Sequence, residues 1–136
     1  MKQILKQFIK FGLVGTSSAI VDFAILNLLV LIFHLNVYLS ATISFVLAVT
    51  NGFIWNRLWT FKSEGVKTLE YSKFMFVNII GLGMNLGIMF VLIQYFGLWY
   101  NFAKAVAIVI VMFWNFYASK RWVFEESSKI KYQSAK

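Results

Sequence analysis

The chain has no cysteine, no proline and a single histidine, His34. Without cysteine it forms no disulfide, thiolate zinc site or iron–sulfur cluster, and it offers no cysteine nucleophile. One histidine excludes a histidine metal cluster, and a Ser/His/Asp triad would have to use His34. Because acid–base catalysis needs suitably placed titratable groups, we expect a protein that is not an enzyme and that holds neither a metal nor a cofactor.

Charged residues are also scarce. Only 13% of the 136 residues are charged, whereas about 25% is usual in soluble proteins. Hydrophobic residues make up 60% of the chain. This composition excludes most soluble folds, and the length allows only one domain. We therefore predict an all-α membrane protein with a single domain over residues 1–136.

Four apolar runs are each long enough to cross a bilayer as a helix, which takes about 20 residues. The runs are continuous rather than alternating, which argues against transmembrane strands. The polar segment Ser127–Lys136 at the end of the chain is expected to fray. The predicted spans are residues 11–33, 38–58, 74–96 and 102–122.

The thirteen lysines and arginines outnumber the five acidic residues and are placed unevenly between the spans. Twelve of them lie on the side of the N-terminus, and the exception is Lys104. Because basic residues are enriched on the cytoplasmic side, both termini are predicted to be cytoplasmic, in a multi-pass protein of the cytoplasmic membrane. The basic residues are thus expected to orient the spans and to contact membrane lipid, and no nucleic-acid partner is expected.

An internal similarity appears when the sequence is shifted by 63 residues. The pattern Phe53-x-x-x-Arg57-x-Trp59-x-Phe61 then matches Phe116-x-x-x-Lys120-x-Trp122-x-Phe124. Each half contains two spans, so both halves start on the same side of the membrane. We predict two parallel repeats of a two-helix hairpin, residues 10–61 and 73–124. The halves either frame a central site or are a simple duplication, and the sequence leaves both interpretations open.

Polar residues interrupt the spans. Asp22 lies near the middle of the first span, where a carboxylate costs about 2.5–3.5 kcal/mol, so it is expected to face protein or water near Asn85 or Lys104. Such residues either line a hydrophilic site or bond across helices, and the pattern Gly83-x-x-x-Gly87 could bring two helices close. The candidate residues for such a hydrophilic site are Asp22, Asn51, Asn85 and Asn115.

Basic residues at the ends of the spans are candidates for binding phosphate. Arg57 and Lys120 each end a span beside a tryptophan and a phenylalanine, on the predicted cytoplasmic side. Arginine suits phosphate because its planar fork can donate two hydrogen bonds. Lys104 is a third candidate near the outer surface, although it could instead snorkel to headgroups. The alternative for the inner pair is that these residues only set topology and contact anionic lipid.

Several short motifs occur in a defined order along the chain. They are Phe8-x-x-Phe11-x-x-Val14-Gly15, then Asp22, Asn56-Arg57-x-Trp59-Thr60-Phe61, Lys73-Phe74, and Asn115-Phe116 through Lys120-Arg121-Trp122-Val123-Phe124. In this order and spacing they resemble the GtrA-like family of small four-span membrane proteins, over nearly the whole chain. One departure concerns the end of the fourth span. It carries Ser119-Lys120-Arg121, whereas the second span ends in an asparagine–arginine pair.

The resemblance implies translocation, or flipping, of a polyprenyl-phosphate-linked sugar across the cytoplasmic membrane. The four polar candidates above would then bind the sugar or headgroup. Undecaprenyl phosphate is the expected carrier, and the sugars serve cell-surface polysaccharides and the cell wall, such as O-antigen or teichoic acid. An alternative is an accessory or anchoring subunit of a membrane glycosyltransferase. A second alternative is a small drug exporter, because such exporters carry an ionisable carboxylate in the first span, as this chain does with Asp22. Because four short spans scarcely enclose a headgroup, we expect a homo-oligomer or a glycosyltransferase partner.

Overall fold

The computed structural model describes residues 2–135, except the side chains at positions 38, 100, 101, 134 and 135. The chain divides into two compact units, Met1–Ser63 and Glu64–Lys136. Each unit contains two long helices that pack against each other. The boundary falls in the charged connection between the second and third predicted spans.

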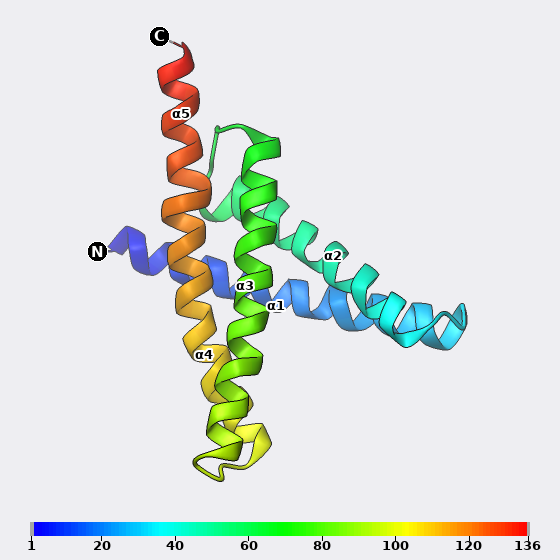
Figure 1. Cartoon of the computed structure of the whole chain (residues 1–136). Helices are drawn as coiled ribbons and strands as arrows, with labels where there is room; N and C mark the ends of the chain where they lie inside the picture. The colour runs from blue at the N-terminus through cyan, green and yellow to red at the C-terminus, as the bar shows by residue number, and fades with distance from the viewer. Residues whose placement is uncertain (1, 136) are drawn as a thin grey trace. The chain divides into compact units, whose positions relative to one another are not determined.

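The first unit is a helical hairpin (Figure 1). Helix α1 spans Lys2–Asn27 and continues as a short π-helix, η1, over Leu28–Ile32. Helix α2 spans Val37–Trp55 and continues as a second π-helix, η2, over Asn56–Thr60. The long apolar sequence of both helices and the absence of proline allow each to run without a break.

The second unit also contains a hairpin and adds a helix at its end (Figure 1). Helix α3 spans Lys67–Gln94 and α4 spans Tyr100–Ala118. The chain then continues through the π-helix η3, Ser119–Glu125, into α5, Glu126–Ala135. The prediction that Ser127–Lys136 frays is therefore wrong for its described residues. The Oγ atom of Ser127 accepts a hydrogen bond from the Val66 backbone N–H at 2.9 Å, which ties the start of α5 to the loop before α3.

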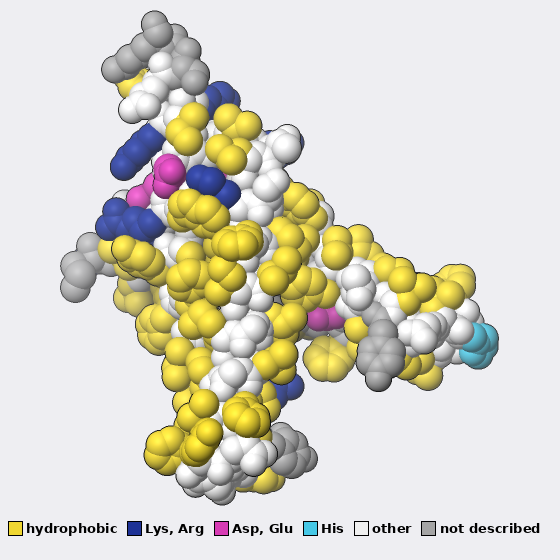
Figure 2. Space-filling view, viewed as in Figure 1, with side chains coloured by type: hydrophobic (Ala, Val, Ile, Leu, Met, Phe, Trp, Pro, Cys, Tyr) yellow, Lys and Arg dark blue, Asp and Glu magenta, His cyan; other side chains and the backbone are white. Residues whose placement is uncertain are grey.

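The predicted four-span, all-α membrane protein is confirmed. Within the described part of the chain, four helical segments are long and apolar enough to cross a bilayer: Lys2–Ile32, Leu39–Thr60, Lys67–Gln94 and Phe102–Gln133. Figure 2 shows hydrophobic side chains over most of the visible face of α3 and α4, with basic side chains gathered towards α5. A large exposed apolar surface of this kind suits contact with lipid. The first and third helices begin several residues earlier than the sequence predicted, at Lys2 and Lys67.

Small residues set the contact between α3 and α4. Ala103 and Ala107 are fully buried on α4. On α3, a Cβ atom at Gly81 would lie 2.7 Å from Oδ1 of Asn115, so this glycine permits the close approach. The Gly83-x-x-x-Gly87 pattern makes no such contact within the second unit, because a Cβ at either glycine would meet nothing within 4 Å among the described residues.

The variant Gly65→Ala should destabilise the second unit. A Cβ at Gly65 would lie 2.8 Å from the carbonyl carbon of Ser127 and 2.6 Å from Oε2 of Glu70. Overpacking of this kind costs about 1–3 kcal/mol, which should lower the midpoint of thermal unfolding in detergent. Gly83→Ala is the matched control, because its Cβ would enter open space. Equal midpoints for the two variants would contradict the tight packing of α5 against the loop.

Candidate functional site

A cluster of polar side chains joins the two helices of the first unit. The Nδ2 atom of Asn51 on α2 donates to Oγ of Ser17 at 3.1 Å and to Oγ of Ser18 at 3.0 Å, both on α1. The Ser17 hydroxyl in turn donates to the carbonyl of Val14 at 2.8 Å. The side chains of Asn51, Ser17 and Ser18 are half-buried, and Val14 is buried. Asn51, a predicted site residue, therefore lies in a hydroxyl-rich cluster at the helix contact.

A hollow of about 460 Å³ opens beside this cluster. Ser17 belongs to both, so the hollow has one polar wall. The other walls are apolar and include two indole rings one helical turn apart. Its lining residues are Leu13, Val14, Ser17, Trp55 and Trp59. Aromatic rings beside a hydroxyl give this part of the hairpin both an apolar and a hydrogen-bonding character.

Lys10 packs against the aromatic edge of the hollow. Its Nζ atom lies 5.1 Å from the centroid of the Trp59 ring, within the range of a cation–π interaction. In the second unit, the Nζ atom of Lys73 lies 4.9 Å from the centroid of Trp122. Both residues of the second pair stand 63 positions after those of the first. The contact is thus the same in the two units, while the parallel repeat as a whole stays a prediction.

A second cavity, lined in part by Lys10, lies between the first turns of α1 and the end of η2. Its volume is about 470 Å³, and half of its eight lining residues are lysines. The backbone of Lys62 has a φ of 47°, a left-handed conformation that is uncommon outside glycine. The lining residues are Lys2, Gln3, Lys6, Gln7, Lys10, Thr60, Phe61 and Lys62. We call this site the lysine cavity.

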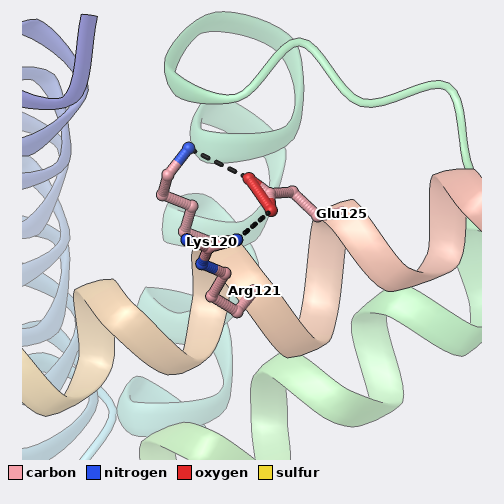
Figure 3. A network of polar contacts seen from close by, with 3 residues as sticks. All are labelled: Lys120, Arg121 and Glu125. Atoms are coloured by element: carbon pink, nitrogen blue, oxygen red, sulfur yellow. Dashed lines mark hydrogen bonds and ion pairs between the residues drawn. The ribbon is translucent and has the colours of Figure 1, made fainter. Parts of the chain in front are cut away.

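The basic residues at the corresponding end of the second unit are paired with carboxylates. Figure 3 shows Glu125 between two cations of η3: Lys120 Nζ lies 3.0 Å from its Oε2 atom, and Arg121 Nη1 lies 3.4 Å from its Oε1 atom. Lys73 Nζ lies 3.7 Å from Oε1 of Glu126. Lys120, a predicted phosphate ligand, thus already has an anionic partner within its own unit.

The other basic candidates lie in different surroundings. Arg57 is half-buried in η2, next to Asn56, whose Oδ1 atom accepts a hydrogen bond from the Thr60 hydroxyl at 2.8 Å. Asn56 itself is 2% exposed. Lys104 is exposed on α4. Because π-helical turns are frequent at functional sites, the position of Arg57 in η2 and of Lys120 in η3 supports both as candidates.

The remaining predicted sugar-binding residues are distributed over both units. Asp22 is half-buried on α1 and makes no hydrogen bond or ion pair with the described residues of the first unit. Asn85 is half-buried on α3. The Oδ1 atom of Asn115 on α4 is buried and has no hydrogen-bond partner among the described residues. The proximity of Asp22 to Asn85 or Lys104 stays a prediction, because those residues belong to the second unit.

Sequence reasoning missed most of the residues that line the two hollows of the first unit. It treated the N-terminal lysines as topology signals only, and it gave Ser17 and Trp55 no role. One available signal was the residue at position 62, because the 63-residue shift places Lys62 opposite Glu125. A charge reversal between otherwise similar segments indicates that the two ends differ in chemistry.

The variant Asn51→Leu should loosen the first unit by a moderate amount. It removes both interhelical hydrogen bonds to the serines, and such bonds contribute about 0.6–1.7 kcal/mol within membranes. We expect a lower midpoint of thermal unfolding in detergent. Asn27→Leu is the control, because the exposed Asn27 amide bonds only to the carbonyl of Phe23 in its own helix. A control variant that is as unstable as Asn51→Leu would argue against the cluster.

Comparison with known proteins gives a consistent result. The chain is 31% identical over 134 residues to the uncharacterized membrane protein YngA of Bacillus subtilis (strain 168), covering 95% of this chain and 86% of the relative. It is 27% identical over 121 residues to the uncharacterized membrane protein YwcD of the same organism, covering 86% of this chain and 95% of the relative. The family described as GtrA/DPMS, transmembrane domain, matches residues 10–124. The predicted GtrA-like resemblance is thereby confirmed, and the chain belongs to the GtrA/DPMS transmembrane-domain family.

Proposed function

We propose that this protein translocates a polyprenyl-phosphate-linked sugar across the cytoplasmic membrane. Membership of the GtrA/DPMS family points to the handling of such lipids. The observation that carries the proposal is the arrangement along the first hairpin. A cationic cavity, an aromatic hollow and an amide–hydroxyl cluster follow one another, and Lys10 of the cavity contacts Trp59 of the hollow. An amphiphile with a phosphate and a sugar has the same sequence of chemical groups.

Each part of the lipid would meet a different part of the hairpin. The amide of Asn51 and the serine hydroxyls would bond to sugar hydroxyls, and the indole of Trp55 would cover an apolar face of the ring. Arg57 would hold the phosphate at the inner end of α2. The prenyl chain stays in the lipid. Transfer between leaflets forms and breaks no covalent bond, so the proposal requires no catalytic residue, metal or cofactor.

Both termini should be cytoplasmic. The motivation is the uneven placement of lysine and arginine, twelve of thirteen on one side. The natural chain lacks cysteine, so single cysteines introduced at Asn36 and Ser63 can be labelled without background. An impermeant thiol reagent should reach position 36 from outside the cell and position 63 only after the inner face is opened. The reverse labelling pattern would overturn the topology.

Reconstitution tests the transport function directly. The purified chain is placed in liposomes that contain undecaprenyl-phosphate-linked hexose, and an impermeant glycosidase reports the fraction of sugar in the outer leaflet. We expect exchange between leaflets to be faster than in protein-free liposomes. No acceleration would contradict translocation. If deletion of the gene in cells instead lowers the amount of a membrane glycosyltransferase, the accessory-subunit alternative is favoured. Transport by the purified chain alone, as a homo-oligomer, supports the proposal.

A further inference from the structure

The charges around the lysine cavity are not balanced within the first unit. The cavity is lined by Lys2, Lys6, Lys10 and Lys62. The only acidic residue in Met1–Ser63 is Asp22, twelve residues after Lys10 on the same helix. At a rise of about 1.5 Å per residue this separation is about 18 Å along the helix axis. The first unit therefore supplies no carboxylate that neutralises the cavity.

In the second unit, by contrast, three cations have carboxylate partners. Lys120 and Arg121 lie beside Glu125, Lys73 lies beside Glu126, and Glu70 is fully buried in the same unit. The residues 63 positions earlier are Lys62, Ser63 and Gln7, none of which is acidic. Each of these three carboxylates is thus replaced by a neutral or basic residue in the first unit. Neutralising the cavity lysines therefore requires an anion from outside the first unit, and a bound anionic ligand would supply one.

The two ends also differ in how they are filled. In the second unit the start of α5 closes the space beside α3: a Cβ at Gly65 would lie 2.8 Å from the Ser127 carbonyl carbon. The position 63 residues before Gly65 is Lys2, which lines the cavity. The cavity volume of about 470 Å³ lies in the range of small-molecule sites, about 300–1,000 Å³.

Two further features of the cavity are those of a binding site. The Oε1 atom of Gln7 is buried and has no hydrogen-bond partner among the described residues, so the side chain has an unsatisfied acceptor that a ligand hydroxyl would satisfy if Gln7 turned towards it. Lys62 keeps its left-handed backbone, with a φ of 47°. Such conformations cost free energy in a non-glycine residue and gather at functional sites. A ligand that carries both anionic oxygens and a hydroxyl would satisfy the lysines and Gln7 together.

We propose that the lysine cavity binds the phosphate group of the transported ligand, as a site additional to Arg57. The inference rests on the proposed function for the nature of the ligand, a phosphate ester that joins a prenyl chain to a sugar. Lys10 lines the cavity and lies over Trp59, which lines the apolar hollow. A phosphate held by the lysines would leave the remainder of the ligand beside the indole rings.

Equilibrium binding tests the proposal without requiring transport. The full chain is placed in nanodiscs of phosphatidylcholine, and radiolabelled undecaprenyl monophosphate is the probe. The variant Lys2→Gln/Lys6→Gln/Lys62→Gln removes three cavity lysines and keeps Lys10 on Trp59. We expect it to bind the probe at least about tenfold more weakly than the natural chain. The control Lys67→Gln/Lys129→Gln/Lys131→Gln removes the same charge from positions of the second unit that are exposed, as Lys2, Lys6 and Lys62 are, and it should retain the natural affinity.

A second variant protects the test against a misfolded triple mutant. Gln7→Glu/Lys62→Glu places in the first unit two acids that the second unit carries at the corresponding positions, Glu70 and Glu125. These carboxylates should occupy the cavity lysines, so we expect the variant to fold and to lose probe binding. If both cavity variants bind the probe as tightly as the control, the lysine cavity is not the phosphate site.

Competitors identify the source of the phosphate. Displacement by inorganic phosphate that depends on the three lysines would indicate a site for phosphate itself, whereas resistance to it would indicate a lipid headgroup; either outcome keeps the assignment. If phosphatidylglycerol binding falls equally in the cavity variant, the cavity is a general contact for anionic lipid and the assignment is overturned. If the natural chain does not bind the probe at all, the proposed function itself fails, which separates the two hypotheses.

Discussion

Replacing Arg57 with glutamine should reduce transfer of the lipid-linked sugar by about ten- to a hundredfold. The reason is the loss of charge-assisted hydrogen bonds to phosphate, which contribute about 1.5–3 kcal/mol each, and about 1.4 kcal/mol corresponds to a factor of ten in affinity. Arg57→Lys keeps the topology signal but loses the planar fork, so its effect should be intermediate. The measurement is the rate of sugar exposure in proteoliposomes.

Lys120→Gln is the matched variant in the second unit, and its effect should be smaller. The Lys120 ammonium already lies 3.0 Å from a carboxylate oxygen of Glu125, which offsets its attraction for a phosphate (Figure 3). Expression and topology have to be measured with transfer, because both cations also orient the spans. If all three variants insert normally and transfer at the natural rate, these basic residues only set orientation.

Replacing Asp22 with asparagine should reduce transfer by about tenfold while leaving the amount of folded protein unchanged or higher. A charged acceptor that binds a sugar hydroxyl contributes about 1.5–3 kcal/mol. The same carboxylate costs about 2.5–3.5 kcal/mol near mid-membrane, so removing its charge should favour insertion. Opposite changes in activity and yield would distinguish a binding role from a packing role.

The yield of Asp22→Asn is measured by size-exclusion chromatography in detergent, beside transfer in proteoliposomes. Asp22→Leu serves as the second variant, because it removes the hydrogen-bonding group as well as the charge. It should abolish what transfer remains. A parallel fall of yield and transfer in Asp22→Asn would mean that the carboxylate bonds across helices and has no part in binding.

The spans could be predicted from the sequence because a bilayer imposes a length and a composition on each helix. The apolar runs at 38–58 and 102–122 correspond to helical segments Leu39–Thr60 and Phe102–Gln133. The ends were less predictable. Polar residues such as Lys2 and Glu126 carry no apolar signal, and whether they continue a helix depends on contacts such as the Ser127 hydrogen bond to Val66.

The candidate site was predictable only in part. Asn51 could be predicted as a candidate because an amide is costly in an apolar span. Its partners Ser17 and Ser18 lie more than thirty residues away in the sequence, so only the tertiary structure identifies them. The lysine cavity combines the start of α1 with the end of η2. No local pattern reports that these segments meet, so the lysines were assigned to topology alone.

The sequence by itself determined the membrane-spanning class, the number of spans and the family, because apolar runs and motif order are local properties of the chain. Only the tertiary structure decided which cations are neutralised and which are not. Lys120 and Lys73 lie beside carboxylates in the second unit, while the first unit gathers its lysines around a cavity without one. The physical reason is that electrostatic attraction depends on distance in space and on burial, and neither is set by distance along the chain.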